Sequence, residues 1–221
     1  MAARRPVPVR LAAPIPALPG REAFGRLSVE PKYDRYRILL LRYDGRCALE
    51  FRRGTDLSRS FHDIVAAAVE QVPDETILDG EVVVGIDGRL EFAELQKRVA
   101  SPVRAVALAR ERPATFLAFD LLVLNERDLR ALPLSRRRTE LTALMAACPP
   151  LQQVPFTLDH DQAAQWLEDY AAAHIGVEGL ILKRVDKPLP RGSAALVQAR
   201  HRDSAEVLVG AVTGTLQHPS G

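Results

Sequence analysis

Short stretches of this chain alternate apolar with polar residues and are rich in Val, Ile, Leu and aromatic side chains. Runs of this kind, bounded by turn residues, are typical of β-strands. The pattern predicts extended segments at residues 27–32, 36–43, 47–52, 77–84, 115–124, 178–184 and 206–213. Asp44-Gly45 and Asp87-Gly88 each follow one of these segments, and Asp-Gly favours a two-residue hairpin turn. Neighbouring strands should therefore pair antiparallel.

Three other stretches have apolar residues three and four positions apart, as a helix requires. In residues 60–72 the shared face consists of Phe61, Ile64, Val65, Ala68 and Val72, with Ser60 as the expected N-cap and Pro73 after the end. In residues 161–174 it consists of Ala163, Trp166, Leu167 and Tyr170, which we interpret as core. The third stretch is 135–147. Strands and helices do not alternate regularly, so the pattern predicts an α+β fold with antiparallel β-sheets flanked by helices.

The composition is that of a globular chain of 221 residues, 47% hydrophobic, with a formal charge of +2. Residues 1–20 contain no acid and are interrupted by prolines, so we expect a flexible N-terminal arm. No apolar run approaches the ~20 residues of a membrane span, so we expect no membrane association. Cys47 and Cys148 form no CxxC pair, which favours a reducing cytoplasm and argues against structural zinc.

The chain has 26 arginines but only four lysines, at positions 32, 97, 183 and 187, so a lysine beside other reactive groups is noteworthy. Strand alternation would place Glu30, Lys32 and Asp34 on one side. A lysine amine becomes a nucleophile only when neighbouring cations or desolvation depress its usual pKa of about 10.4. Arg35 and Arg37 could act in this way. The alternative is an exposed edge strand with alternating charges.

Three further segments carry candidate chemistry, and each also has a purely structural interpretation. Asp79 and Glu81 share a strand face and could hold Mg²⁺ or a ribose hydroxyl, or could be solvated acids of a turn. Residues 116–123 form an apolar strand with one acid, and residues 177–184 form another that ends in Lys183. The first could be a core strand with Asp120 capping a loop, and the second could carry a structural ion pair. Neither GxxxxGK[ST] nor GxGxxG is present, so a P-loop and a dinucleotide fingerprint are excluded.

Taken in order, these segments resemble a known family. Five segments carry the resemblance: Glu30-x-Lys32-x-Asp34, Asp79-Gly80-Glu81, Ala118-Phe119-Asp120, Glu178-Gly179 followed by three aliphatic residues and Lys183, and a basic segment ending in His201-Arg202-Asp203. The family is that of the ATP-dependent DNA ligases, especially bacterial ones, and the resemblance covers residues 14–216. The resemblance implies a DNA ligase-like nucleotidyltransferase fold. It divides the chain into the arm at 1–20, an adenylation domain at 21–205, and at 206–221 the start of a truncated oligonucleotide-binding (OB-fold) barrel.

The same resemblance implies a reaction and a site. Lys32 would attack the α-phosphate of ATP to form lysyl-AMP, and AMP would pass to a 5′-phosphate of nicked double-stranded DNA, for nick sealing in DNA repair and recombination. The nucleotide would be bound by Glu30, Arg37, Arg52, Glu81, Phe119, Lys183 and Arg200, and Mg²⁺ by Glu81 and Glu178. Glu30 would recognise the adenine amino group and Phe119 would stack on the base. A bacterial cytoplasmic enzyme is implied.

The chain departs from the family pattern at three places. Arg35 stands where the family has glycine, and Leu196 and Gln198 stand where it has tryptophan and lysine. Loss of a cation beside the α-phosphate should weaken self-adenylation. The chain also ends at Gly221, within the expected barrel, so a partner could supply the barrel or DNA-end binding.

Two other functions stay open at this point. One is a lysine nucleotidyltransferase of the RNA ligase or capping type, against which the segment 201–203 followed by 211–216 favours the DNA ligase branch. The other is a degenerate, non-catalytic module that binds nucleotide or DNA, which would bind ATP without covalent labelling.

Overall fold

A computed structural model describes residues 13–15, 17–33, 36–51, 54–145, 149–173, 176–189, 196–199, 213–215 and 218–220. The strands are β1 (Ala13–Ile15), β2 (Leu27–Tyr33), β3 (Tyr36–Tyr43), β4 (Arg46–Phe51), β5 (Thr76–Ile86), β6 (Arg89–Leu90), β7 (Ala114–Leu124), β8 (Arg127–Asp128), β9 (Leu151–Gln153), β10 (Val177–Arg184), β11 (Leu196–Ala199), β12 (Thr213–Thr215) and β13 (His218–Ser220). The helices are α1 (Arg21–Phe24), α2 (His62–Gln71), α3 (Phe92–Ala100), α4 (Ala105–Glu111), α5 (Leu134–Met145) and α6 (His160–Ala173).

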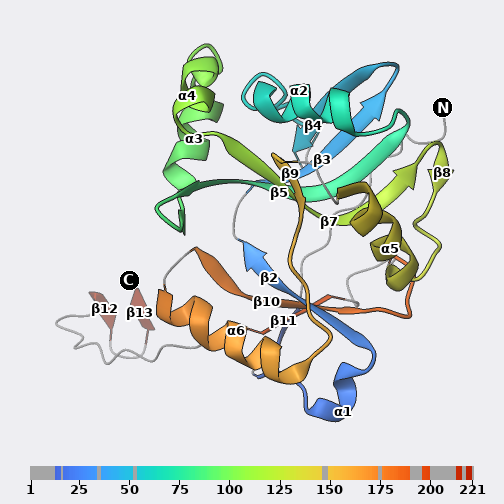
Figure 1. The fold of residues 1–221 in the computed structure, drawn as a ribbon. Coiled ribbons are helices and arrows are strands. Elements are labelled where there is room, and N and C mark those ends of the chain that lie inside the picture. The colour runs from blue at the N-terminus through green and yellow to red at the C-terminus, as the bar shows by residue number, and fades with distance from the viewer. Residues whose placement is uncertain are drawn as a thin grey trace.

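The larger of the two main sheets has the strand order β4-β3-β5-β7-β8, with β6 added to β5 and β9 to β7. Only β9 pairs in parallel within this sheet, among the described residues. Its outer face packs against α2, α3 and α5 through a core that includes Ile38, Leu78, Phe116 and Leu121. Figure 1 shows α2 and the α3–α4 pair on that side of the sheet.

The smaller sheet has the order β1-β11-β10-β2 and its own core. One face of it packs against α1 and α6, where Val29, Leu180 and Leu182 contact Phe24, Ala163, Trp166, Leu167 and Tyr170. Figure 1 shows α6 along the side of this sheet that is turned away from the large sheet. The other face of β2 and β10 is therefore left for the side chains that point toward the large sheet.

The two sheets meet through a small apolar cluster and through backbone hydrogen bonds. Tyr33 of β2 packs with Val83 of β5 and with Phe119 of β7. The backbones of Val29 and Thr157 exchange two hydrogen bonds of 2.9 Å, which tie β2 to the segment between β9 and α6. These contacts fix the polar residues of β2 and β10 opposite those of β5 and β7.

The predicted α+β class is confirmed, and so are six predicted strands, with ends shifted by at most two residues: β2, β3, β4, β5, β7 and β10. The short strands β6, β8 and β9 were not predicted. Both hairpin turns are confirmed by positive φ angles, 50° and 70° at Asp44 and Gly45, and 50° and 77° at Asp87 and Gly88. The predicted helices correspond to α2, α5 and α6, and their predicted apolar faces are buried or partly buried. Most of the predicted strand at 206–213 lies outside the described residues.

Two expectations about helices were wrong or incomplete. Ser60 does not cap α2, because the N-cap is Phe61 and no side chain caps the helix there. The helices α3 and α4 were not predicted from the sequence. The apolar face of α3, made of Phe92, Leu95 and Val99, was missed, and α4 is a short helix that buries only Ala105 and Ala109.

The predicted arm at 1–20 contains a strand, since β1 pairs in parallel with β11. The domain boundaries at 20 and 205 stay predictions, because much of both terminal regions lies outside the described residues. Cys47 is a free thiol, and Cys148 is not among the described residues. Within the described part of the chain, no helix is long and apolar enough to cross a membrane.

Gly80 of β5 packs directly against Phe116 and Leu117 of β7, and a side chain there has no space. An added Cβ would lie 2.5 Å from Cζ of Phe116 and 2.6 Å from the carbonyl oxygen of Leu117. We therefore expect Gly80→Ala to lower the free energy of unfolding by roughly 1–3 kcal/mol, measured by urea denaturation.

Gly85→Ala is the matched control on the same strand. The nearest atom to its added Cβ would be the carbonyl oxygen of Arg89, at 4.0 Å. Its stability should be unchanged or raised by up to about 1 kcal/mol, because alanine restricts the unfolded chain. Equal stability of the two variants would contradict the close approach at Gly80.

Candidate functional site

The inner face of the small sheet carries Lys32, which forms an ion pair with Glu178 of β10. A β-bulge makes this contact possible. Val177 pairs with Tyr33 and Gly179 pairs with Lys32, so Glu178 is the extra residue of β10. Gly179 has a φ angle of 152°, which is favourable only for glycine. The bulge turns the Glu178 carboxylate toward the Lys32 amine, and bulges often direct side chains in this way beside functional sites.

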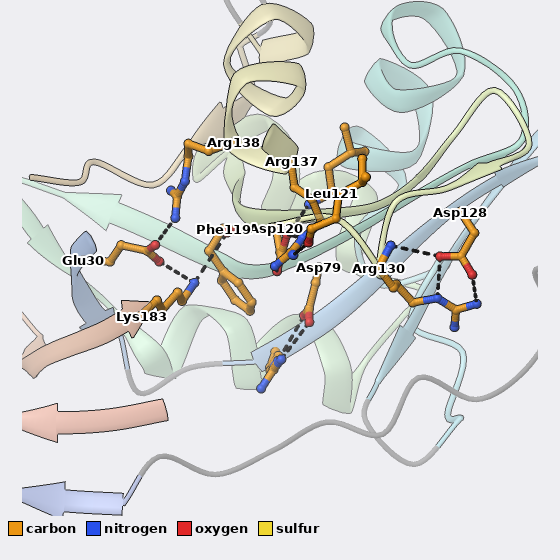
Figure 2. Close-up of polar contacts among 12 residues, drawn as sticks. Glu30, Asp79, Phe119, Asp120, Leu121, Asp128, Arg130, Arg137, Arg138 and Lys183 are labelled. Atoms are coloured by element: carbon orange, nitrogen blue, oxygen red, sulfur yellow. Dashed lines mark hydrogen bonds and ion pairs between the residues drawn. The ribbon is translucent and has the colours of Figure 1, made fainter. Parts of the chain in front are cut away.

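Glu30 lies two residues before Lys32 on the same face of β2 and is only 2% exposed. One carboxylate oxygen accepts a hydrogen bond from Arg138 of α5, and the other accepts one of 2.6 Å from Nζ of Lys183. Figure 2 shows Glu30 between these two cations. A buried carboxylate keeps its charge only when it is paired and hydrogen-bonded, and both conditions hold here.

Phe119 of β7 lies next to this group and contacts two cations. Its ring centroid is 4.5 Å from Nζ of Lys183 and 5.0 Å from Cζ of Arg37, distances typical of cation–π contacts. Phe119 also stands at a bulge, because Gly80 pairs with Ala118 while Asp79 pairs with Asp120. The bulged residues Glu178 and Phe119 thus both point toward the region between the sheets.

Arg37 of β3 is held by Asp79 of β5 through two hydrogen bonds, of 3.0 Å from Nε and 2.7 Å from a terminal nitrogen. Glu81 lies directly opposite Arg37 on β5. The predicted shared face of Asp79 and Glu81 is confirmed, since Leu78, Val82 and Val84 pack in the core on the opposite side. This strand pair therefore places one guanidinium and two carboxylates near Phe119.

Burial and charge alter three pKa values in this region. Burial lowers the pKa of Lys183, and the neighbouring Glu30 carboxylate works in the opposite direction. For Arg37 the pKa is raised, because the attraction of Asp79 and Glu81 outweighs the effect of burial. Burial raises the pKa of Tyr33, and Tyr170, Glu81 and Glu30 add to the effect. Tyr33 is therefore a neutral hydroxyl at physiological pH.

A second buried ion pair fixes the strand end next to Phe119. Arg137 of α5 donates two hydrogen bonds of 2.8 Å to the carboxylate of Asp120 and one of 2.6 Å to the carbonyl oxygen of Leu132. The side chains of Arg137 and Asp120 are only 3% and 7% exposed. Asp120, expected to cap a loop if structural, instead pairs with a helix and holds β7 against α5.

The structure brings together Glu30, Phe119 and Lys183, places Arg37 on the same aromatic ring, and pairs Lys32 with Glu178. Arg52 and Arg200, and the departing residue Arg35, lie outside the described residues. The backbone of Gln198 pairs with Pro14 and Ile181 in the small sheet.

Sequence reasoning missed Arg137 and Arg138, although a signal was present. In a helix over 134–145, both arginines fall on the same side as Leu134, Leu141 and Met145, and all five are buried. An arginine on an apolar helix face needs a buried acid as its partner, and Glu30 and Asp120 are the acids of two candidate segments.

Metal binding by these residues would depend on a ligand that brings its own oxygens. The described residues contain no group of three or more His, Cys, Asp or Glu side chains able to hold a metal ion. Mg²⁺ bound with a polyphosphate needs only one or two protein carboxylates, because phosphates and waters complete its shell.

Comparison with known proteins identifies the family. The family model for the "ATP dependent DNA ligase domain" matches residues 18–194, which is most of the chain. The chain belongs to this family. The match supports the DNA ligase branch rather than an RNA ligase or a capping enzyme. It covers every part of this ligase domain that contributes to the site described above.

Relatives and solved structures agree with this assignment. DNA ligase C2 of Mycolicibacterium smegmatis is 36% identical over 88% of this chain, and DNA ligase C of Mycobacterium tuberculosis is 29% identical over 98%. A structure of mycobacterial DNA ligase D complexed with ATP and MES is 28% identical, with a TM-score of 0.64 over 87% of this chain and 61% of that one. The chain spans 54% and 59% of the length of the two ligase C relatives.

The Arg137–Asp120 pair should be a large contributor to the stability of this ligase domain. Arg137→Met leaves the Asp120 carboxylate buried without its main cation, so we expect the free energy of unfolding to fall by about 3–5 kcal/mol. Urea denaturation followed by circular dichroism measures the change.

Arg136→Met is the control, because Arg136 is exposed on the same helix. Surface substitutions of this kind usually change stability by less than about 0.5 kcal/mol. If both variants unfolded at the same urea concentration, the proposed contribution of the buried pair would be wrong.

Proposed function

We propose that this chain is the adenylation domain of an ATP-dependent DNA ligase and that Lys32 is its nucleophile. Nζ of Lys32 forms a bond to the α-phosphorus of ATP, the bond from that phosphorus to the oxygen bridging to the β-phosphate breaks, and pyrophosphate leaves. The product is lysyl-AMP, a phosphoramidate that can pass AMP to the 5′-phosphate of a DNA nick.

The observation that carries this proposal is the position of Lys32, in a chain of this family, beside Glu178 on the inner face of the small sheet. The amine must lose a proton before it attacks, and Glu178 already accepts a hydrogen bond from it. Lys183 lies on the same face, where its ammonium could move onto the phosphates. Fixed cations aimed at the leaving pyrophosphate lower the barrier to this kind of displacement.

Recognition of the nucleotide is assigned to the residues around Phe119. The ring would stack on adenine, the Glu30 carboxylate would accept a hydrogen bond from the adenine amino group, and Glu81 would bind a ribose hydroxyl. Arg37 would contact ribose or phosphate, since Asp79 holds its guanidinium beside the ring. Arg52 and Arg200 remain assigned to the nucleotide by resemblance alone.

We assign Mg²⁺ to Glu81 and Glu178, with the remaining ligands from phosphate oxygens and water. Bound there, the cation would neutralise charge on the triphosphate. The carboxylate donors fit a hard cation of this kind. Glu178 would then contact both the metal and the Lys32 amine, so its substitution should affect the covalent step more than the affinity for ATP.

Nicked double-stranded DNA is the acceptor that we propose, for repair and recombination in the bacterial cytoplasm. The formal charge of +2 is small for a DNA-binding protein, because affinity for DNA rises with the number of phosphates neutralised. An OB-fold barrel, expected from residue 206 onward or supplied by a partner, would contribute much of the affinity for DNA. Nick sealing is therefore proposed for the complete ligase.

The test is covalent labelling with α-labelled ATP and Mg²⁺, followed by denaturing electrophoresis, after the protein has been stripped of AMP with pyrophosphate. We expect labelling of the wild-type chain and a loss of more than about 100-fold in Lys32→Ala, because the nucleophile is gone. Glu178→Gln should reduce the labelling rate by roughly 10- to 1000-fold.

Lys97→Ala is the matched control. Lys97 is an exposed lysine of α3 whose partner is Glu94 of the same helix, so labelling should be unchanged. A folded wild-type chain that binds ATP but takes up no label would overturn the catalytic proposal and favour a nucleotide-binding module. Label that persists in Lys32→Ala would assign the nucleophile to another residue.

A further inference from the structure

Arg138 and Lys183 share the buried carboxylate of Glu30 but differ in their other contacts. The Arg138 side chain is 7% exposed and its Cζ lies 4.6 Å from the ring centroid of Phe156. It projects from α5, whose first two backbone amides donate hydrogen bonds of 2.9 Å to the carbonyl oxygens of Lys187 and Val185. Arg138 is thus fixed by its ring contact and by the attachment of its helix to the segment that follows β10.

Lys183 has a different set of contacts. Its amine donates to one oxygen of Glu30, makes a long contact of 3.5 Å with the carbonyl oxygen of Phe119, and lies over the Phe119 ring. A lysine amine at the end of four methylene groups can turn to a new partner more easily than a stacked guanidinium can. If Lys183 turns toward the phosphates, as the proposed function requires, Glu30 loses one of its two cations.

A buried carboxylate that lost its last cation would take up a proton or become a strong source of instability. A second cation that stays beside the carboxylate prevents this. Two of its other N–H groups, on Nε and Nη1, are buried and have no hydrogen-bond partner among the described residues. The guanidinium therefore has unused hydrogen-bond donors. If Lys183 leaves, they could donate to the second oxygen of Glu30, in the two-point geometry that arginine favours with carboxylates.

We propose that Arg138 is a positioning residue for base recognition. It holds the Glu30 carboxylate in a fixed, charged orientation toward the 6-amino group of adenine, and it remains the countercharge of Glu30 when Lys183 moves to the triphosphate. This inference rests on the proposed function, in which Glu30 reads the base. Arg138 itself touches neither the base nor the reacting phosphate.

The consequence is a specific effect on base selection. Adenine presents a 6-amino donor, whereas hypoxanthine presents a 6-oxo acceptor that a fixed carboxylate repels. Wild-type protein should therefore prefer ATP to inosine triphosphate. Without Arg138, Glu30 is free to turn with Lys183, so the preference should fall by about tenfold, the usual range for losing one charge-assisted contact.

The experiment compares the concentration dependence of lysyl-AMP and lysyl-IMP formation with labelled ATP and inosine triphosphate in Arg138→Met, Arg138→Lys and wild type. Arg138→Met should raise KM for ATP and lower the ATP preference, with a smaller change in kcat. Arg138→Lys keeps the charge without the fork, so it should restore part of the preference. Arg136→Met, on the exposed side of α5, should behave as wild type.

A double-mutant cycle tests whether Arg138 acts through Glu30. In a Glu30→Gln background the carboxylate charge is absent, so adding Arg138→Met should change base preference by less than about twofold. A purely structural role predicts a fall in thermal stability with the ATP preference intact, or an equal effect in both backgrounds. Either result would overturn the inference. If Arg138→Met does not fold, Arg138→Lys carries the same comparison.

Failure of the inference and failure of the proposed function give different results. If wild type forms lysyl-AMP but Arg138 variants keep full base preference, only the inference fails. If wild type takes up no label, equilibrium binding of ATP and inosine triphosphate still measures the preference and its dependence on Arg138. A wild-type chain that shows no preference in either measurement overturns the role given to Glu30 and therefore the inference.

Discussion

Pairing of buried carboxylates with arginine is the interaction on which the rest of this structure depends. Glu30, Asp79 and Asp120 each lie on a different strand, each is at most 6% exposed, and each is bonded to a guanidinium. Two of the guanidinium groups come from adjacent residues of α5 and reach one strand in each sheet. The helix thereby sets the distance between the sheets, because moving either sheet would leave a charge buried without its partner.

This arrangement also gives different roles to the two kinds of cation in the chain. Arginine stays charged and forms planar, forked contacts, which suits permanent ion pairs in the interior. Lysine can change its proton and its partner, which suits covalent chemistry and phosphate contacts. The strong bias toward arginine in the composition leaves Lys32 and Lys183 as two of only four lysines, and both lie on the inner face of the small sheet.

Much of the fold could be predicted from the sequence, because strands such as β3 and β5 are runs of apolar residues and the stripes of α2 and α6 each mark one buried face. The order of the candidate segments was equally informative about the family. What could not be predicted were features decided by tertiary contacts. The short helix α4 buries only two alanines. The arginine partners of Glu30 and Asp120 lie 108 and 17 residues away along the chain, respectively.

Because of the bulge at Glu178, the number of residues between Glu178 and Lys183 determines which side of the sheet each side chain faces. In a regular strand, residues an odd number of positions apart face opposite sides, so Glu178 and Lys183 would be separated by the sheet. The extra residue and the unusual backbone of Gly179 reverse that parity and put both side chains on one side. Gaining or losing one residue between them would send one of the two side chains to the α6 face, even if acid, glycine and lysine were all retained. The interval between the residues is thus as much a part of the chemistry as the residues themselves.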